Sequence, residues 1–234
     1  MLMITREQFA AMQDHSILEP YATENEIRKR CEETIQYGFS AVYVNPCWVS
    51  FAKQIIGDKA KVGHVVGFPH GANTTKIKIA EALEEIDNGA EDLDLVINIS
   101  KLKSKEYDYV ENELKQFVKA VKDKKPSVLV KIIIETCYLN HDEKIKACEI
   151  VARSGADYIK TSTGCGPAGC KVSDIRIMKR IVGDKMKIKG ADRISSIEDA
   201  LSIIEEGASL LGESHAIEWL ADWDKQLWSK DYKK

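Results

Sequence analysis

The sequence predicts a single-domain α/β protein of the (β/α)8 TIM-barrel class, on three observations. Short runs rich in β-branched residues alternate with longer charged segments of helical periodicity. Eight such strand-then-helix units can be counted, which suits a closed parallel barrel better than an open doubly wound sheet. The 234 residues, 44% of them hydrophobic, suffice for one large core, and no Pro/Gly/Ser-rich linker divides them. We therefore assign residues 1–234 to one barrel, with 215–234 as its last helix and tail.

The first four units fill the amino-terminal half. Thr23, followed three residues later by Glu26, has the pattern that caps the start of a helix. Runs such as AVYVN and LDLVIN have strand composition and length. We expect strands around residues 16–18 and at 41–45, 64–68 and 93–98, each followed by a helix, at 24–37, 47–56, 75–88 and 103–122.

The second half repeats the alternation. Ser196 followed by Asp199 marks another helix start, and a Gly-Ala pair precedes several strands, as expected for a glycine that ends a helix before a tight turn. We expect strands at 127–135, 158–162, 186–191 and 210–214, and helices at 142–154, 173–181, 196–206 and 217–228.

Composition limits the classes of partner. The 34 basic and 37 acidic residues leave a net charge of −3, which argues against nucleic acid or an anionic membrane surface as the main partner. The sequence has no uninterrupted apolar run of about 18 residues, and its first residues carry charges too early for a secretory signal. The six cysteines form no CxxC pair and are interpreted as free thiols in a reducing cytoplasm, not as a metal site.

Polar residues inside the expected strands are candidates for chemistry. Side chains alternate between the barrel interior and the helix layer, so Asp94 shares the interior face with Val96 and Asn98. Lys160 and Lys189 lie on neighbouring strands, where a nearby cation and desolvation would favour the neutral amine that attacks a carbonyl. A structural aspartate and snorkelling lysines are the alternatives. Lys131 is interpreted as an ion-pair residue near the barrel bottom.

One motif suggests a nucleotide and is rejected. Residues 164–169, GCGPAG, match the G-x-G-x-x-G dinucleotide fingerprint directly after a strand. Pro167 interrupts the run, however, and the next helix is expected only from Ser173 or Asp174, too late for the third glycine to open it. A glycine-rich loop that borders an active site is the better interpretation.

At these residues the chain resembles the deoxyribose-phosphate aldolase family. The resemblance runs in order from DHSILEP (14–20) through AVYVNPCWV, VVGFPHGANTTKIKIAEA, GAEDLDLVIN, VKIIIET and GADYIKTSTGCGPAG to GES (212–214). The KTSTG segment is the most specific of these motifs.

The resemblance implies roles for individual residues. Lys160 would be the Schiff-base nucleophile, Lys189 the second lysine that lowers its pKa, and Asp94 part of a proton relay. The family reaction cleaves 2-deoxyribose 5-phosphate to glyceraldehyde 3-phosphate and acetaldehyde, with neither metal nor organic cofactor. The remaining residues that we expect to contact the small-molecule substrate are Asn45, Cys47, Thr161, Gly190, Asp192, Arg193, Gly212, Glu213 and Ser214.

Three segments depart from the family pattern. The family reads K-A-S-G-G-I-R-T after the seventh strand, where this chain has Asp192-Arg193 for Gly-Gly and Ser195 for Arg. G-T-S becomes Gly212-Glu213-Ser214, and the lysine of D-H-T-L-L-K-P becomes Glu19. Barrel enzymes hold phosphate at such loops, so the substitutions predict a weakened phosphate site.

Three other functions stay open at this point. The same Schiff-base chemistry could act on an unphosphorylated or cationic substrate, the barrel could bind a small molecule without catalysis, or it could be an NAD-dependent reductase. Trp219, Trp223 and Trp228 recur at near-helical spacing, which suits either core packing of the last helix or the interface of a homodimer or higher homo-oligomer.

Overall fold

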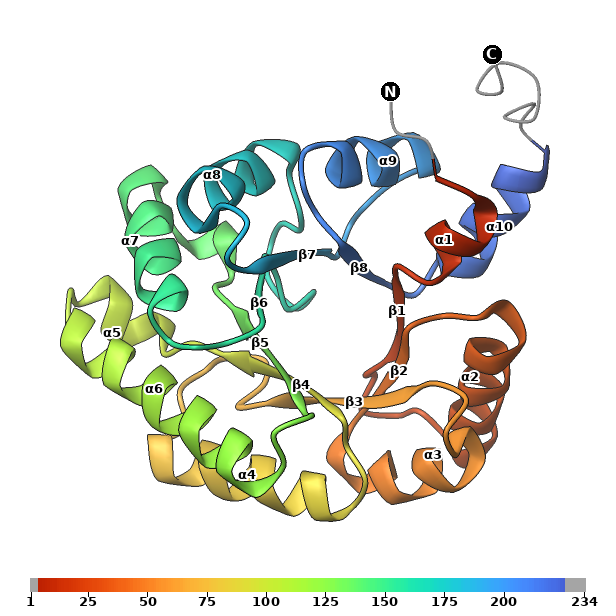
Figure 1. Cartoon of the computed structure of the whole chain (residues 1–234), viewed down its shortest axis with the longest axis horizontal. Coiled ribbons are helices and arrows are strands. Elements are labelled where there is room, and N and C mark those ends of the chain that lie inside the picture. The colour runs from red at the N-terminus through yellow and green to blue at the C-terminus, as the bar shows by residue number, and fades with distance from the viewer. Residues whose placement is uncertain (1–3, 226–234) are drawn as a thin grey trace.

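The computed structural model describes residues 4–225, and within them eight parallel strands close into a barrel in sequence order. Figure 1 shows the strands as an inner ring surrounded by the helices. This confirms the predicted (β/α)8 fold. The strands are β1 (Gln13–Ile17), β2 (Ala41–Val44), β3 (Lys61–Val66), β4 (Asp92–Val96), β5 (Leu129–Ile133), β6 (Tyr158–Lys160), β7 (Lys187–Ala191) and β8 (Leu210–Glu213).

The helices form the outer layer of the molecule (Figure 1). The main α-helices are α1 (Arg6–Ala10), α2 (Glu24–Tyr37), α3 (Val49–Ile56), α4 (Thr75–Asp87), α5 (Ile99–Lys103), α6 (Tyr107–Lys124), α7 (His141–Ala152), α8 (Val172–Val182), α9 (Ile197–Glu205) and α10 (Ala216–Lys225). Two short 3-10 helices, η1 (Pro46–Trp48) and η2 (Thr136–Tyr138), follow β2 and β5.

The caps predicted from the sequence are present. The Glu26 carboxylate accepts hydrogen bonds from the Thr23 N–H at 2.8 Å and the Thr23 hydroxyl at 2.6 Å, and the Asp199 N–H donates to Ser196 at 3.1 Å. The glycines of the three Gly-Ala pairs, at positions 89, 155 and 207, all have positive φ. Such a backbone conformation favours glycine and allows the tight turn from helix to strand.

One helix was predicted with the wrong start, and another was missed. The helix expected at 103–122 begins only at Tyr107, as α6, because Lys105 takes a left-handed φ of 61° and separates it from the short helix α5. The short helix α1 was not predicted at all; it is capped by Thr5, and its Phe9 is completely buried.

The apolar core lies in the shell between strands and helices, not inside the barrel. Alternate strand residues such as Leu93, Leu95 and Ile97 belong to this large shell cluster. The buried apolar cluster of the interior is small, with Ala41, Tyr43 and Val65. The interior is therefore left to polar and charged side chains.

The carboxyl-terminal aromatic residues that the structure describes pack against the amino terminus. Trp219 is 3% exposed, and its ring lies 6.3 Å from that of Phe9 in α1, while the ring of Trp223 stacks on Phe9 at 5.2 Å. This agrees with the core-packing interpretation for these two residues. Trp228 lies outside the described residues.

Candidate active site

A cavity of about 340 Å³ opens at the carboxyl ends of the strands. This is the end of the barrel at which TIM-barrel enzymes place their active sites. Its wall comes mainly from the ends of β1, β6, β7 and β8 and the loops that follow them, and it includes Ser16, Leu18, Glu19, Lys160, Thr163, Gly164, Cys165, Ala191, Asp192, Glu213 and Ser214.

Asp94 holds both predicted lysines at the floor of this cavity. Its Oδ2 lies 2.6 Å from Nζ of Lys160 and 3.0 Å from Nζ of Lys189. The two lysines occupy paired positions in the register of β6 and β7, so their side chains enter the interior at one level. All three side chains are buried. The fold thus brings together Asp94, Lys160 and Lys189, the three residues that the sequence analysis identified as candidates for chemistry.

Tyr43 and Asp14 complete the contacts of the floor. The Tyr43 hydroxyl donates to Asp94 Oδ1 at 2.8 Å, and Lys189 Nζ lies 4.0 Å from the centre of the Tyr43 ring. Lys189 also forms an ion pair of 2.6 Å with Asp14. Lys189 is therefore held by two carboxylates, whereas Asp94 is the only carboxylate in ion-pair contact with Lys160 among the described residues.

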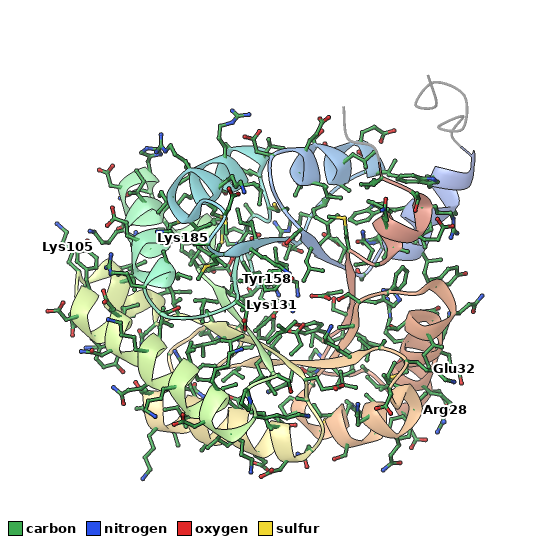
Figure 2. The ribbon with its side chains drawn as sticks, in the orientation of Figure 1. Arg28, Glu32, Lys105, Lys131, Tyr158 and Lys185 are labelled. Atoms are coloured by element: carbon green, nitrogen blue, oxygen red, sulfur yellow. The ribbon has the colours of Figure 1, made fainter. Side chains whose placement is uncertain are left out.

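A second charged layer lies beneath the floor. Lys131 Nζ makes an ion pair with Asp92 and donates to the Tyr43 hydroxyl at 2.6 Å, with Asp14 at 3.3 Å. Figure 2 shows Lys131 and Tyr158 inside the ring of strands, whereas Arg28 and Glu32 point outward from α2. Lys131 is thus an interior ion-pair residue, as the sequence suggested.

The environment of Lys160 favours its reactive form. Burial lowers the pKa of Lys160 to about 8; the Asp94 carboxylate opposes this shift, and the charge of Lys189 adds to it. For Asp94, burial favours the protonated form, but the nearby lysines outweigh it and hold its pKa below the usual range. The site therefore pairs an ionised carboxylate with an amine that is more easily deprotonated than an ordinary lysine.

Of the predicted substrate-binding residues, four line the cavity: Asp192, Gly212, Glu213 and Ser214. A Cβ on Gly212 would lie only 2.9 Å from Lys189 Cε, so glycine leaves room for the lysine at this position. Glu213 is 7% exposed and accepts a hydrogen bond from the Ile194 N–H at 3.1 Å.

The structure places Asn45 and Cys47 outside the cavity wall. The side-chain amide of Asn45 donates to the Leu18 carbonyl at 3.1 Å. Asn45 therefore holds the segment after β1, which forms part of the cavity wall. Cys47 is exposed in η1 and lines a separate groove with Ile77 of α4. The chain turns away from the barrel mouth at Pro46, which places Cys47 on the outside.

Thr161, Gly190 and Arg193 also lie outside the cavity wall. Thr161 is buried, and its hydroxyl accepts from the Ala191 N–H at 3.0 Å, which joins β6 to β7. Gly190 faces the helix layer, because a Cβ there would meet Ile203 at 2.8 Å. Arg193 donates to the carbonyls of Gly166 and Pro167, so its guanidinium fastens the β6–α8 loop.

The sequence reasoning missed several residues of the site, above all Asp14, Tyr43 and Thr163. The alternation that placed Asp94 inside the barrel could have placed Tyr43 there too, since it faces the same way as Ala41 on β2. Asp14 was missed because the first strand was expected to start near residue 16, after this residue.

The described residues, 4–225, contain neither a candidate metal site nor a helix suited to a membrane. Within that range no group of three or more His, Cys, Asp or Glu side chains is arranged to hold a metal ion. None of the helices in the same range has the length and apolarity that crossing a membrane requires.

Comparison with known proteins gives one consistent answer. Residues 8–200 match the model of the DeoC/LacD family aldolases. The chain is 49% identical over 218 residues to a deoxyribose-phosphate aldolase of Caldanaerobacter subterraneus subsp. tengcongensis, which covers 93% of this chain and 94% of that protein.

Solved structures share the fold. A putative deoxyribose-phosphate aldolase from Coccidioides immitis superimposes with a TM-score of 0.89 at 32% identity, over 94% of this chain and 87% of that one. The deoxyribose phosphate aldolase from Aeropyrum pernix, described as a unique tetramer, has a TM-score of 0.85 at 28% identity, over 95% and 93% of the two chains.

Proposed function

This chain belongs to the DeoC/LacD family of aldolases, and we propose that it cleaves 2-deoxy-D-ribose 5-phosphate to D-glyceraldehyde 3-phosphate and acetaldehyde through a Schiff base on Lys160. The chain is therefore a lyase. The substrate is the one that the names of its relatives indicate.

One observation carries the proposal: Asp94 Oδ2 contacts both Lys160 and Lys189 on the floor of the cavity. A nucleophilic lysine must lose its proton before it attacks, and a carboxylate at 2.6 Å is placed to move that proton. A barrel that only bound a ligand would gain nothing from a buried lysine of lowered pKa.

Schiff-base formation comes first. The neutral Lys160 amine attacks the C1 aldehyde of the open-chain sugar and forms a carbinolamine. Proton transfer through Asp94 to the C1 hydroxyl lets it leave as water, and the product is a protonated imine. Lys189 stays paired with Asp14 and Asp94 and keeps the positive charge close to Lys160.

Cleavage of the carbon–carbon bond follows. A base removes the proton of the C3 hydroxyl, the C2–C3 bond breaks, and its electron pair moves to C1–C2 while the imine nitrogen is neutralised to an enamine. C3 leaves as the aldehyde carbon of glyceraldehyde 3-phosphate. Protonation of the enamine at C2 gives an imine again, and its hydrolysis by one water molecule releases acetaldehyde and free Lys160.

A product assay tests this function. Purified protein should release acetaldehyde and glyceraldehyde 3-phosphate in equal amounts from deoxyribose 5-phosphate, and Lys160→Met should release neither. Lys187→Met is the matched control, because this lysine lies on β7 but is exposed at the opposite end of the barrel. Cleavage that survives in Lys160→Met would contradict the proposal.

We also propose that the enzyme is cytoplasmic and forms a homo-oligomer. All six cysteines are free thiols, which suits a reducing compartment. The tetramer described for the Aeropyrum pernix relative is the support for assembly. Light scattering of the purified chain measures its oligomeric state directly, and a monomer at all concentrations would contradict the proposed homo-oligomer.

A further inference from the structure

The rim of the cavity carries acidic side chains. Glu19, Asp192 and Glu213 line it, from the segment after β1, the loop after β7 and the end of β8. Among the described residues, the only lysines or arginines that line this cavity are Lys160 and Lys189, and both are paired with carboxylates on the floor. The basic groups near these carboxylates, the Arg193 guanidinium at 3.5 Å from Asp192 and the His215 imidazole at 3.4 Å from Glu213, are not part of the cavity wall, so a substrate that enters meets the carboxylates first.

Two backbone donors near this rim are already used by the protein. TIM-barrel enzymes commonly bind phosphate with backbone N–H groups of the loops after strands 7 and 8 and with a helix amino terminus. Here the Ile194 N–H in the loop after β7 donates to the carboxylate of Glu213 at 3.1 Å. At the start of α9, the Asp199 N–H donates to Ser196, and Glu198 adds a negative charge to the first turn.

The one arginine of the loop faces elsewhere. The guanidinium of Arg193 donates to the carbonyls of Gly166 and Pro167, and its Nε lies 3.5 Å from the Asp192 carboxylate. The Asp192 carboxylate itself lies against Gly164 across the mouth: a Cβ on that glycine would be 3.3 Å from Oδ1. Arg193 therefore fastens the loop and is committed to partners other than a ligand.

From this arrangement we propose that Asp192 and Glu213 are specificity-determining residues, which suit the cavity to a 2-deoxyaldose that ends in a neutral hydroxyl group instead of a phosphate. The inference rests on the proposed function, because the chemistry at Lys160 is the same for both sugars. Glu213 occupies a backbone donor that a phosphate would need, and Asp192 adds a second negative charge.

Charge and hydrogen bonding explain the preference. A phosphate monoester carries close to two negative charges at pH 7 and would be repelled by both carboxylates, more strongly where water is excluded. A sugar hydroxyl can donate a hydrogen bond to a carboxylate, which only accepts. The rim thus changes which end group is tolerated and leaves the reacting carbons unaffected.

The test compares two substrates. We would measure kcat/KM for 2-deoxyribose and for 2-deoxyribose 5-phosphate with the native protein, with Glu213→Gln and Asp192→Asn, and with the double variant. The native protein should cleave the unphosphorylated sugar at least as efficiently as the phosphate. The double variant should shift the ratio toward the phosphate by about 10- to 100-fold, since each removed charge changes the repulsion by on the order of 1 kcal/mol.

Asp184→Asn is the matched control, because it removes a carboxylate that is fully exposed before β7, at the far end of the barrel, and should leave the ratio unchanged. A purely structural role of Glu213 or Asp192 would lower both efficiencies together and leave the ratio unmoved, which would overturn the inference. Native protein that prefers the phosphate by 100-fold or more would also overturn it. Failure to cleave either sugar would instead overturn the proposed function.

Discussion

At the scale of single residues, the reactivity of Lys160 follows from where it is buried. With its pKa lowered to about 8, roughly one lysine in ten is neutral at pH 7, against fewer than about one in a thousand for an ordinary lysine. We expect kcat/KM to rise with pH and to level off above about pH 8, because the neutral amine is the nucleophile. A profile that is flat from pH 6 to 9 would contradict this assignment.

The two charged neighbours of Lys160, Asp94 and Lys189, should shift the rising limb of the plot of kcat/KM against pH in opposite directions. The Asp94 carboxylate raises the pKa of Lys160, so Asp94→Asn should shift the limb to lower pH; Lys189 lowers that pKa, so Lys189→Met should shift it to higher pH. Both variants should also lose about 100-fold or more in kcat if the proton transfer is as proposed. Variants that merely loosened the fold would lower kcat without opposite shifts.

Gly212 tests how closely the floor is packed. A Cβ at this position would lie 2.9 Å from Lys189 Cε and 3.2 Å from the Ala191 side chain. Gly212→Ala should therefore displace Lys189, lower kcat, and cost about 1–3 kcal/mol of unfolding free energy from overpacking. Gly183→Ala meets no atom within 4 Å but has a positive φ, which Gly212 does not have, so it shows the effect of backbone strain without overpacking. If the two variants had equal kcat, the packing argument would fail.

At the scale of elements, the loop after β6 depends on Glu135. This residue is 1% exposed and has a left-handed φ of 53°, and its carboxylate accepts from the Thr163 N–H at 3.1 Å and from the Thr163 hydroxyl. Thr163 lines the cavity beside Lys160. These hydrogen bonds offset the backbone strain at Glu135 and fix the position of Thr163 in the cavity wall.

Removal of that carboxylate should loosen the wall. We expect Glu135→Ala to raise KM and to lower the unfolding free energy by about 1–3 kcal/mol, because buried donors on Thr163 lose their acceptor. Glu135→Gln keeps one acceptor and should recover part of both losses. Denaturant unfolding with steady-state kinetics measures the two effects, and an unchanged KM in Glu135→Ala would argue against the loop's role.

Most elements of the fold could be predicted from local patterns, and the misses have local causes. The caps at Thr23 and Ser196 identified helix starts, because side-chain capping depends on neighbouring residues alone. The break between α5 and α6 was not visible, since Lys105 at positive φ has no sequence signature of the kind that glycine gives. Cys47 lies outside the cavity because the chain turns into η1 at Pro46. Gly190 was expected at the site from the family pattern, but it follows the inward-facing Lys189 on β7 and therefore faces the helix layer.

At the scale of the whole molecule, the barrel has a charged interior inside an apolar shell. In the described interior Lys131, Lys160 and Lys189 are in ion-pair contact with Asp14, Asp92 and Asp94, so the charges balance across two layers. The sequence could identify which residues face inward but not which lysine meets which aspartate. That pairing depends on strand register around the closed barrel, and no local pattern encodes it.

The balance predicts how the fold responds to loss of one charge. Lys131→Met should cost about 3–5 kcal/mol in unfolding free energy, because Asp92 stays buried without its partner. Lys131→Met combined with Asp92→Leu should cost less than the single change. Lys119→Met is the surface control: it removes an exposed pair with Asp123 and should have almost no effect. Equal losses in the single and double variants would contradict the account.

Chemical trapping of the imine identifies the lysine that forms the Schiff base. The native protein would be incubated with acetaldehyde, reduced with borohydride, digested and analysed by peptide mass spectrometry. Reduction of the imine leaves an ethyl group on the amine, so we expect this group on Lys160. Lys189 and Lys131 should stay unmodified, because each is paired with two or more carboxylates, whereas Lys160 is paired with Asp94 alone among the described residues. Folded protein that carried no ethyl group on Lys160, or that carried it on Lys189 instead, would contradict the mechanism.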